Sequence, residues 1–255
     1  MIILINNDKV NDVNKVIFIE EENMISIEQA KELIECAKEY GRSIGTPEEI
    51  LVSYHNHVHG VAEMTKMLAT KMGIENPQRV YVLALLHDLG KVAERRKEVF
   101  HGVLGYNILK DIDPEASDIC LTHMFPLNQI EGYDKMDRYF FYKENDYNLV
   151  REKLENSPLT DIDRIIQFSD FVSSDKGYVT IEEKTQALNK GRGMPEFALN
   201  NMLKNKRYLD DKLGIDVYEL FNEVDKSFLI KENKKTNIIN ENLKKKLIEF
   251  KSRMK

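Results

Sequence analysis

Six side chains in the sequence combine metal-binding chemistry with an apolar helical setting. All six His residues of the chain lie between positions 55 and 123, and four of these, with two Asp, fall on apolar faces of predicted helices. The six are His57, His87, Asp88, His101, His123 and Asp170. Any one of them alone would more often be a satisfied core polar group. A buried carboxylate is costly, however, and a bound cation offsets that cost. The full set therefore favours a metal site.

The segment SYHNHVHG offers three His residues that point in different helical directions. His57 shares its face with three apolar residues, at steps of four, three and four. They are Val61, Met64 and Leu68. His59 aligns with a polar face instead, and His55 lies between the two directions near the helix start. We therefore expect His57 to face inward and His59 to face outward. Replacement of His57 in the site by His55 or His59 stays an open alternative.

The ligand types of this set suit transition metals. Neutral imidazoles and carboxylates bind Fe, Mn, Zn, Ni or Co. Six protein ligands exceed what one hydrolytic metal with an open position needs. They suit two divalent transition metal ions about 3.5–4 Å apart, with Asp88 bridging them, which bind a phosphate and activate water. Asp88 is therefore also a candidate catalytic residue.

Three cations follow the HD doublet closely. Lys91 lies one helical turn beyond His87, where it can contact a substrate phosphate or protonate a leaving oxygen. Lys91 is thus a candidate for both catalysis and substrate binding. Arg95 and Arg96 are further substrate-binding candidates, although an exposed charged loop is the better interpretation for at least one of them.

The elements around these residues are predicted to be mostly helical. Ser26 and Gln29 form a capping-box pattern for a helix ending near Gly41. Further helices are expected after Thr46 and Pro47 up to Gly73, and then over residues 77–92, 101–110, 114–124 and 161–174. Apolar runs at 2–5 and 16–20 suggest a small β-hairpin. We predict an all-α bundle with an N-terminal segment (1–24), a metal-binding helical domain (25–185) and a helical C-terminal extension packed on it (186–255).

The composition fits a soluble chain. Hydrophobic residues make up 42% and charged residues 31%, and no apolar run is long enough for a membrane span. The N-terminus lacks a secretion pattern, and two Cys residues fit a reducing cytosol, so we expect a cytoplasmic protein. The net charge of 37 − 43 = −6 gives no general attraction to nucleic acid. We interpret the Lys-rich tail at 231–255 as a solvated helix face.

The ordered motifs resemble the HD phosphohydrolase superfamily. HVHGVAE, LALLHDLGK, HGVLGYNIL, LTHMFP and SDFVSSD stand in the order H…HD…H…H…D between His57 and Asp170. This version of the order is associated with binuclear sites, and it implies the six residues above as ligands with Lys91 near the phosphate. The Gly-Tyr-Pro motif of the cyclic-di-GMP phosphodiesterase branch is absent. SYHNHVHG also resembles the YHNxxH segment of cyclic-nucleotide phosphodiesterases, which would make His55 a general acid and His59 a ligand.

The leading functional hypothesis is hydrolysis of a phosphate ester or anhydride in a nucleotide or another small phosphorylated metabolite. A diiron oxygenase is one alternative, because the same ligand order can hold an iron pair. A regulator that binds a nucleotide without turnover is another. The sequence does not define the substrate, the metal or the oligomeric state.

Overall fold

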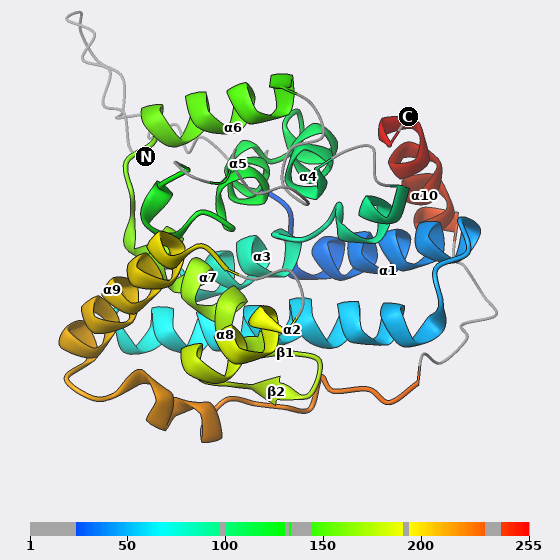
Figure 1. Cartoon of the computed structure of the whole chain (residues 1–255). Helices are drawn as coiled ribbons and strands as arrows, with labels where there is room; N and C mark the ends of the chain where they lie inside the picture. The colour runs from blue at the N-terminus through cyan, green and yellow to red at the C-terminus, as the bar shows by residue number, and fades with distance from the viewer. Residues whose placement is uncertain are drawn as a thin grey trace, which may run out of the picture.

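The computed structural model describes residues 24–96, 100–130, 133, 144–190, 194–232 and 241–254. This part of the chain is mostly helical and has a single two-stranded hairpin, which confirms the all-α prediction (Figure 1). The hairpin expected within 1–24 lies outside the described residues. The elements are α1 (Ile27–Ser43), α2 (Glu48–Lys71), α3 (Pro77–Leu86), η1 (Lys91–Arg96), α4 (His101–Leu109), α5 (Pro114–Thr122), η2 (Pro126–Asn128), α6 (Glu144–Asn156), α7 (Asp161–Val172), β1 (Ser173–Ser174), β2 (Gly177–Tyr178), α8 (Ile181–Asn189), α9 (Glu196–Leu213), η4 (Val217–Asn222) and α10 (Glu241–Arg253).

Helix α1 begins as its capping residues predict but ends later than expected. Ser26 and Gln29 form a reciprocal capping box. The helix continues past Gly41 to Ser43, and the turn is made at Gly45, where φ is +80°. Gly41 serves packing instead, because a Cβ there would lie 2.8 Å from the Leu51 side chain. The prediction that Gly41 ends the helix was therefore wrong.

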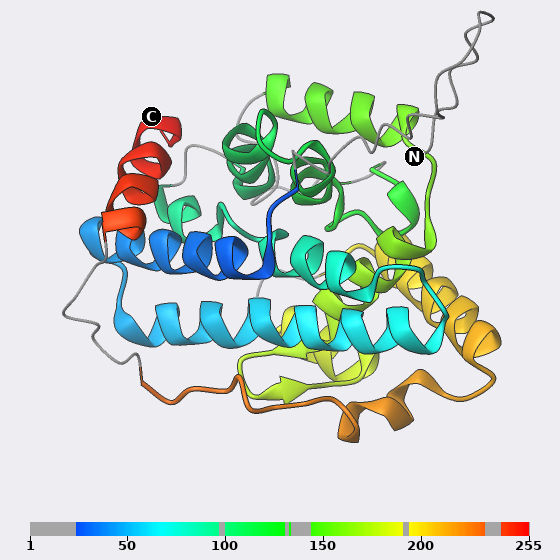
Figure 2. The same cartoon turned by 180° about the vertical axis from the view of Figure 1, so that it is seen from behind.

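Helix α2 is the long central element of the fold. It starts after Pro47 and is followed by Gly73 at φ +70°, as the sequence predicts. It lies alongside α1 and contacts α3 and α7 (Figures 1 and 2). Its buried face carries Val58, Val61 and Met64 into the core. A residue on α2 can therefore meet residues from several helices.

Helix α3 is shorter than its sequence pattern suggests. A helix was expected through residue 92, but α3 ends at Leu86 and the HDLG sequence forms a turn before η1. Gly90 lies so close to α4 that a Cβ there would be 2.3 Å from the His101 carbonyl oxygen. A glycine at this point therefore allows the turn to press against the start of α4.

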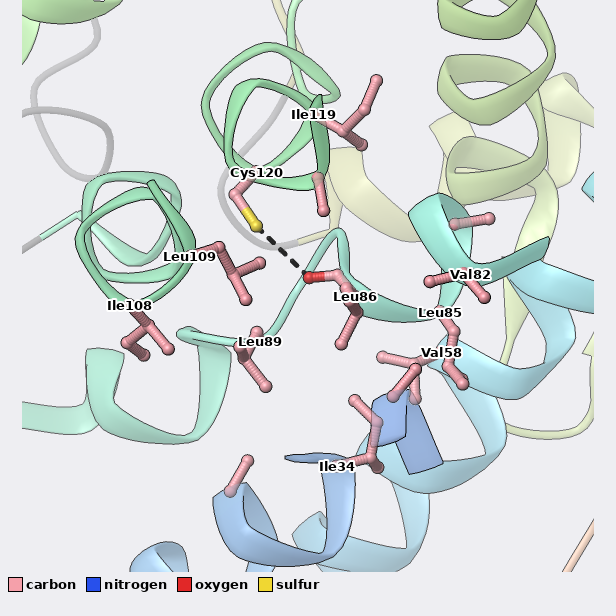
Figure 3. Packing of buried hydrophobic residues seen from close by; sticks show 14 of the residues in the cluster. Ile34, Val58, Val82, Leu85, Leu86, Leu89, Ile108, Leu109, Ile119 and Cys120 are labelled. Atoms are coloured by element: carbon pink, nitrogen blue, oxygen red, sulfur yellow. Dashed lines mark hydrogen bonds between the residues drawn. The ribbon is translucent and has the colours of Figure 1, made fainter. Parts of the chain in front are cut away.

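Helices α4 and α5 pack closely through two further glycines. A Cβ on Gly102 would lie 2.6 Å from the Cys120 carbonyl oxygen, and one on Gly105 would lie 2.7 Å from Cys120 Sγ. The Cys120 thiol donates to the Leu86 carbonyl at 3.3 Å, next to apolar side chains from several elements (Figure 3). This packing joins the ends of α3, α4 and α5. Both Cys36 and Cys120 are buried, as core cysteines should be.

The C-terminal part wraps the central helices. Helix α9 contacts α7, and α10 contacts α1. The predicted boundary at 185/186 falls inside α8 and stays a prediction. Residues 223–232, here called the C-terminal strap, run along α2 on the side away from α1 (Figures 1 and 2). Asn56 fastens the strap, because its side chain donates to the Ile230 carbonyl at 3.0 Å and accepts from Ile230 N at 2.9 Å. Among the described residues, no helix is long and apolar enough to cross a membrane.

Candidate metal centre

Five separate elements carry the predicted ligands to one place. His57 comes from the middle of α2 and Asp170 from α7. The other four lie at helix ends, which the packing of α3, α4 and α5 brings together. His87 and Asp88 follow α3, His101 opens α4, and His123 follows α5. His87, Asp88, His101 and His123 are each 4% exposed or less.

Asp88 is the centre of the cluster, and its two oxygens face different imidazoles. Oδ1 lies 3.2 Å from His101 Nε2 and 3.4 Å from His123 Nε2. Oδ2 lies 3.6 Å from His57 Nε2 and 3.7 Å from His87 Nε2. The carboxylate thus divides four imidazoles into two pairs, one on each oxygen.

Asp170 lies beside the first of these pairs. Its Oδ1 is 3.0 Å from His57 Nε2 and 3.5 Å from His87 Nε2. Asp170 Oδ1 therefore faces the same two imidazoles as Asp88 Oδ2, whereas Asp88 Oδ1 faces His101 and His123.

Backbone carbonyls orient two of the imidazoles. The Nδ1 atom of His87 lies 2.6 Å from the Ala84 carbonyl, and Nδ1 of His123 lies 3.0 Å from the Ile119 carbonyl. A carbonyl only accepts, so each Nδ1 carries a hydrogen and Nε2 is the ring nitrogen directed at the cluster. This is the usual arrangement behind a metal-binding histidine.

The cluster also changes the pKa values of its members. Burial raises the pKa of Asp88, but Lys91, His87 and His101 lower it by more, so the pKa lies well below its ordinary value. Burial also raises the pKa of Asp170, but the adjacent His57 and His87 imidazoles lower it by more, so this pKa too lies well below its ordinary value. Burial lowers the pKa of His123. Both carboxylates of the cluster, buried Asp88 and partly exposed Asp170, are therefore ionised, and a cation can neutralise them.

The donor set fits metal ions. Three groups of residues each bring their ligand atoms within 4.8 Å of one another. They are His57–His87–Asp88, His87–His123–Asp170 and Asp88–His101–His123. All six predicted ligands occur in these groups. Within the described residues, the buried atoms His87 Nε2 and Asp88 Oδ1 make no hydrogen bond of acceptable geometry. Buried polar atoms that lack such bonds are costly unless they bind something else, and a metal ion is what imidazole and carboxylate bind.

The structure separates His57 from its two neighbours on the same helix. The His55 and His59 rings contact each other in a tilted arrangement, with 4.3 Å between their centroids, and belong to none of the three ligand groups. His59 lies outside the cluster on a polar face of α2, as expected, but it is half-buried and not exposed. Burial lowers the pKa of His55 to about 4 and that of His59 to about 3. The C-terminal strap contributes to this burial at His55, which hydrogen-bonds to the Phe228 backbone, while the Phe228 ring lies over Gly60.

A cavity of about 320 Å³ opens onto the cluster. Its walls beyond the ligands include Ile50, Tyr54, Met124, Phe171, Lys184 and Leu188. Lys91 also lines it, with Nζ 3.5 Å from His101 Nδ1, so this predicted residue lies beside the cluster. The side chains of Arg95 and Arg96 lie outside the described residues, and their substrate-binding role stays a prediction.

Sequence reasoning missed Lys184. It lies on α8 in a region whose sequence gave no functional indication, and its Nζ donates to the Ser173 carbonyl at 3.0 Å. One signal was present. Lys184 occupies the inner face of a short amphipathic helix, three residues after buried Ile181 and four before Leu188. A lysine on an apolar helical face is unusual enough to indicate a partner.

Fold and site together define a helical domain with a candidate histidine–aspartate metal centre. Residues 54–175 match the family model of the HD domain, so this segment of the chain is an HD domain. HD domains are generally metal-dependent hydrolases. No curated protein and no solved structure matches the chain. The matched range contains all six candidate ligands and Lys91, whereas Lys184 lies beyond it.

Proposed function

We propose that this protein is a phosphohydrolase that uses two divalent metal ions to cleave a phosphate ester or anhydride of a small metabolite. The observation that carries the proposal is the division of imidazoles by Asp88. His57 and His87 face one carboxylate oxygen, and His101 and His123 face the other. A bridging carboxylate with separate ligands on each side is suited to a pair of ions.

The ligand assignment follows from this division. One ion would be held by His57, His87, Asp88 and Asp170, and the other by Asp88, His101 and His123. When bound, such ions polarise a phosphoryl oxygen and lower the pKa of water. Fe, Mn, Zn, Ni and Co all suit this ligand set.

The chain itself supplies positioning and charge. His87 and His123 are held in one orientation by the Ala84 and Ile119 carbonyls, so substrate binding requires little rearrangement of these ligands. Lys91 lies at the cavity wall beside His101, where its ammonium can stabilise negative charge that develops on a phosphoryl or leaving oxygen. The apolar walls limit water around the substrate.

The first test is the metal content of protein purified without chelators. We expect about two transition metal ions per wild-type chain and a loss of both in His87→Ala and Asp88→Ala variants that stay folded by circular dichroism. Wild-type protein that binds no transition metal, even after reconstitution with Mn²⁺, Fe²⁺ or Zn²⁺, would contradict the proposal. One ion per chain would contradict the paired-metal part of it.

The second test is phosphate release from a panel of phosphomonoesters, phosphodiesters and nucleotides. We expect Mn²⁺- or Co²⁺-stimulated hydrolysis in the wild type. Lys91→Met should keep its metals but lower kcat by about 10²-fold, as loss of one charge-stabilising donor does. Lys110→Met, an exposed lysine on the neighbouring turn, serves as the matched control. Oxygen uptake by iron-loaded protein without phosphate release would favour an oxygenase instead.

A further inference from the structure

The cavity that opens onto the His/Asp cluster is also lined by a lysine of α8. Helix α8 contacts α7, whose residues Asp170 and Phe171 line the same cavity. Lys184 and Leu188, one helical turn apart on the inner face of α8, line the wall that α8 provides. The cavity is therefore bounded by the cluster on one side and by a lysine-bearing helix on another.

The position of Lys184 on α8 is chemically unusual. The inner face of a short helix is expected to be apolar, and Ile181 on this face is fully buried. Lysine is seldom placed on such a face unless its ammonium meets a partner. Here the stem lies on the apolar face and Nζ donates to the Ser173 carbonyl, just beyond the C-terminal end of α7. That hydrogen bond fixes the ammonium at the edge of the cavity.

The remaining walls between the cluster and α8 are largely apolar. Ile50 and Tyr54 come from α2, Phe171 from α7 and Met124 from the turn after α5. Apolar walls with a few placed polar groups are typical of sites for small organic ligands. A volume of about 320 Å³ is near the lower end of the usual range of roughly 300–1,000 Å³. The cavity therefore has the size of a site for a small molecule.

We propose that Lys184 is a specificity-determining residue that binds a second anionic group of the substrate, so that the enzyme selects small phosphorylated metabolites carrying a further phosphate or carboxylate. The inference rests on the proposed hydrolase function, because the metal centre takes the phosphate that is cleaved. The apolar walls pack against the carbon skeleton between the two anions. Lys184 touches the substrate at its far end and takes no part in the chemical step.

The test uses Mn²⁺-loaded full-length protein and three small probes. Calorimetry compares the binding of phenylphosphonate, which has one anionic group, with that of 4-carboxyphenylphosphonate and 1,4-phenylenebisphosphonate, which have two. We expect the wild type to bind at least one doubly anionic probe about tenfold more tightly, as one charge-assisted hydrogen bond would produce. Lys184→Met should remove this preference while phenylphosphonate binding stays unchanged. Lys184→Arg should keep most of it.

Lys190→Met is the matched control, because Lys190 ends the same helix but is exposed. It should behave like the wild type. A wild type without preference, or a preference that survives Lys184→Met, overturns the inference.

The same probes keep the two proposals apart. Hydrolysis of phenyl phosphate without any preference for a second anion would leave the phosphohydrolase standing and overturn the role of Lys184. A preference that depends on Lys184, with no hydrolysis of phenyl phosphate, 4-carboxyphenyl phosphate or the nucleotide panel, would support the recognition site and overturn the hydrolase. If folded, metal-loaded protein neither binds the probes nor hydrolyses the phosphate esters, both proposals are overturned.

Discussion

Two buried carboxylates, Asp88 and Asp113, show how the same group serves opposite purposes in this molecule. Asp113 is 1% exposed and accepts four hydrogen bonds. Two come from the Arg79 guanidinium at 2.7 and 2.6 Å, and two come from the Ile25 and Ala116 backbone amides at 3.0 and 3.1 Å. This carboxylate has a full set of protein partners, and it ties the start of α1 and the start of α5 to α3.

Asp88 is just as buried, at 4% exposed, but its partners are of another kind. Imidazole nitrogens surround both oxygens at 3.2–3.7 Å, and Oδ1 makes no hydrogen bond of acceptable geometry within the described residues. An imidazole can lose a proton and bind a metal through the freed nitrogen, whereas a guanidinium stays protonated. The difference teaches that burial alone does not identify a functional acid. The identity and protonation chemistry of its neighbours do.

The largest expected effect is the loss of activity in Asp88→Asn. Metal content should fall to background and phosphate release by about 10³-fold or more, because several kcal/mol of charge stabilisation disappear. The stability of metal-free protein should change less than it does in Asp113→Asn, since the neighbouring imidazoles can become neutral. Elemental analysis, a phosphate assay and urea unfolding in EDTA measure the three quantities. Retention of both metals by Asp88→Asn would break the comparison.

The converse variant, Asp113→Asn, should lower stability without affecting the metal centre. It leaves the Arg79 guanidinium, 10% exposed, with Glu115 as its remaining carboxylate, so the loss should stay below the about 3–5 kcal/mol that breaking a buried pair costs. Metal content and kcat should stay near wild type at temperatures where the variant is folded. Urea unfolding measures the loss, and Asp111→Asn, an exposed neighbour, is the control. If the free energy of unfolding of Asp113→Asn equalled that of Asp111→Asn, the structural role of Asp113 would be refuted.

Acid should reduce the stabilising effect of Asp113. Burial raises the pKa of Asp113, but the Arg79 hydrogen bonds and the Ile25 and Ala116 amides lower it by more, so the folded pKa lies below the usual value. A group with a depressed folded pKa stabilises the protein fully above its unfolded pKa of about 4, and this stabilisation is lost as pH falls through the folded pKa. The stability difference between wild type and Asp113→Asn in EDTA should therefore be constant above about pH 5 and shrink below about pH 4. A difference independent of pH would mean that charge is not its origin.

Local patterns in the sequence predicted the helices and the six candidate ligands. The Arg79–Asp113 pair and the place of Lys184 depend on contacts between distant parts of the chain, and these were not predicted. The Ser26–Gln29 capping box and the apolar face of His57 involve residues within one or two helical turns, so they can be read directly. The pairing of Arg79 with Asp113 spans 34 residues, and Lys184 enters the cavity through contact of α8 with α7. No periodicity encodes such contacts. The hydrogen bond between His55 and the Phe228 backbone of the C-terminal strap is the same kind of case.

Gln167 combines features of both carboxylates and carries the smallest predicted effect. It is 1% exposed and hydrogen-bonded like Asp113, yet it lies one turn before Asp170. It accepts from Leu127 N at 3.0 Å and donates to Asn128 Oδ1 at 3.0 Å. Both partners have left-handed φ, +59° and +56°, which is strained for residues other than glycine.

Gln167 therefore holds a strained turn four residues after His123, and Gln167→Met should cost about 1–2 kcal/mol of stability by leaving a backbone amide unsatisfied. Metal affinity should fall by about tenfold, the low end of the effect of residues that support ligands. Urea unfolding and metal titration measure both, with exposed Gln186→Met as the control. Adding Leu127→Gly should recover part of the stability, because glycine adopts this φ without strain. If Leu127→Gly destabilises the Gln167→Met variant further, the turn is not held against strain and Gln167 acts through packing alone.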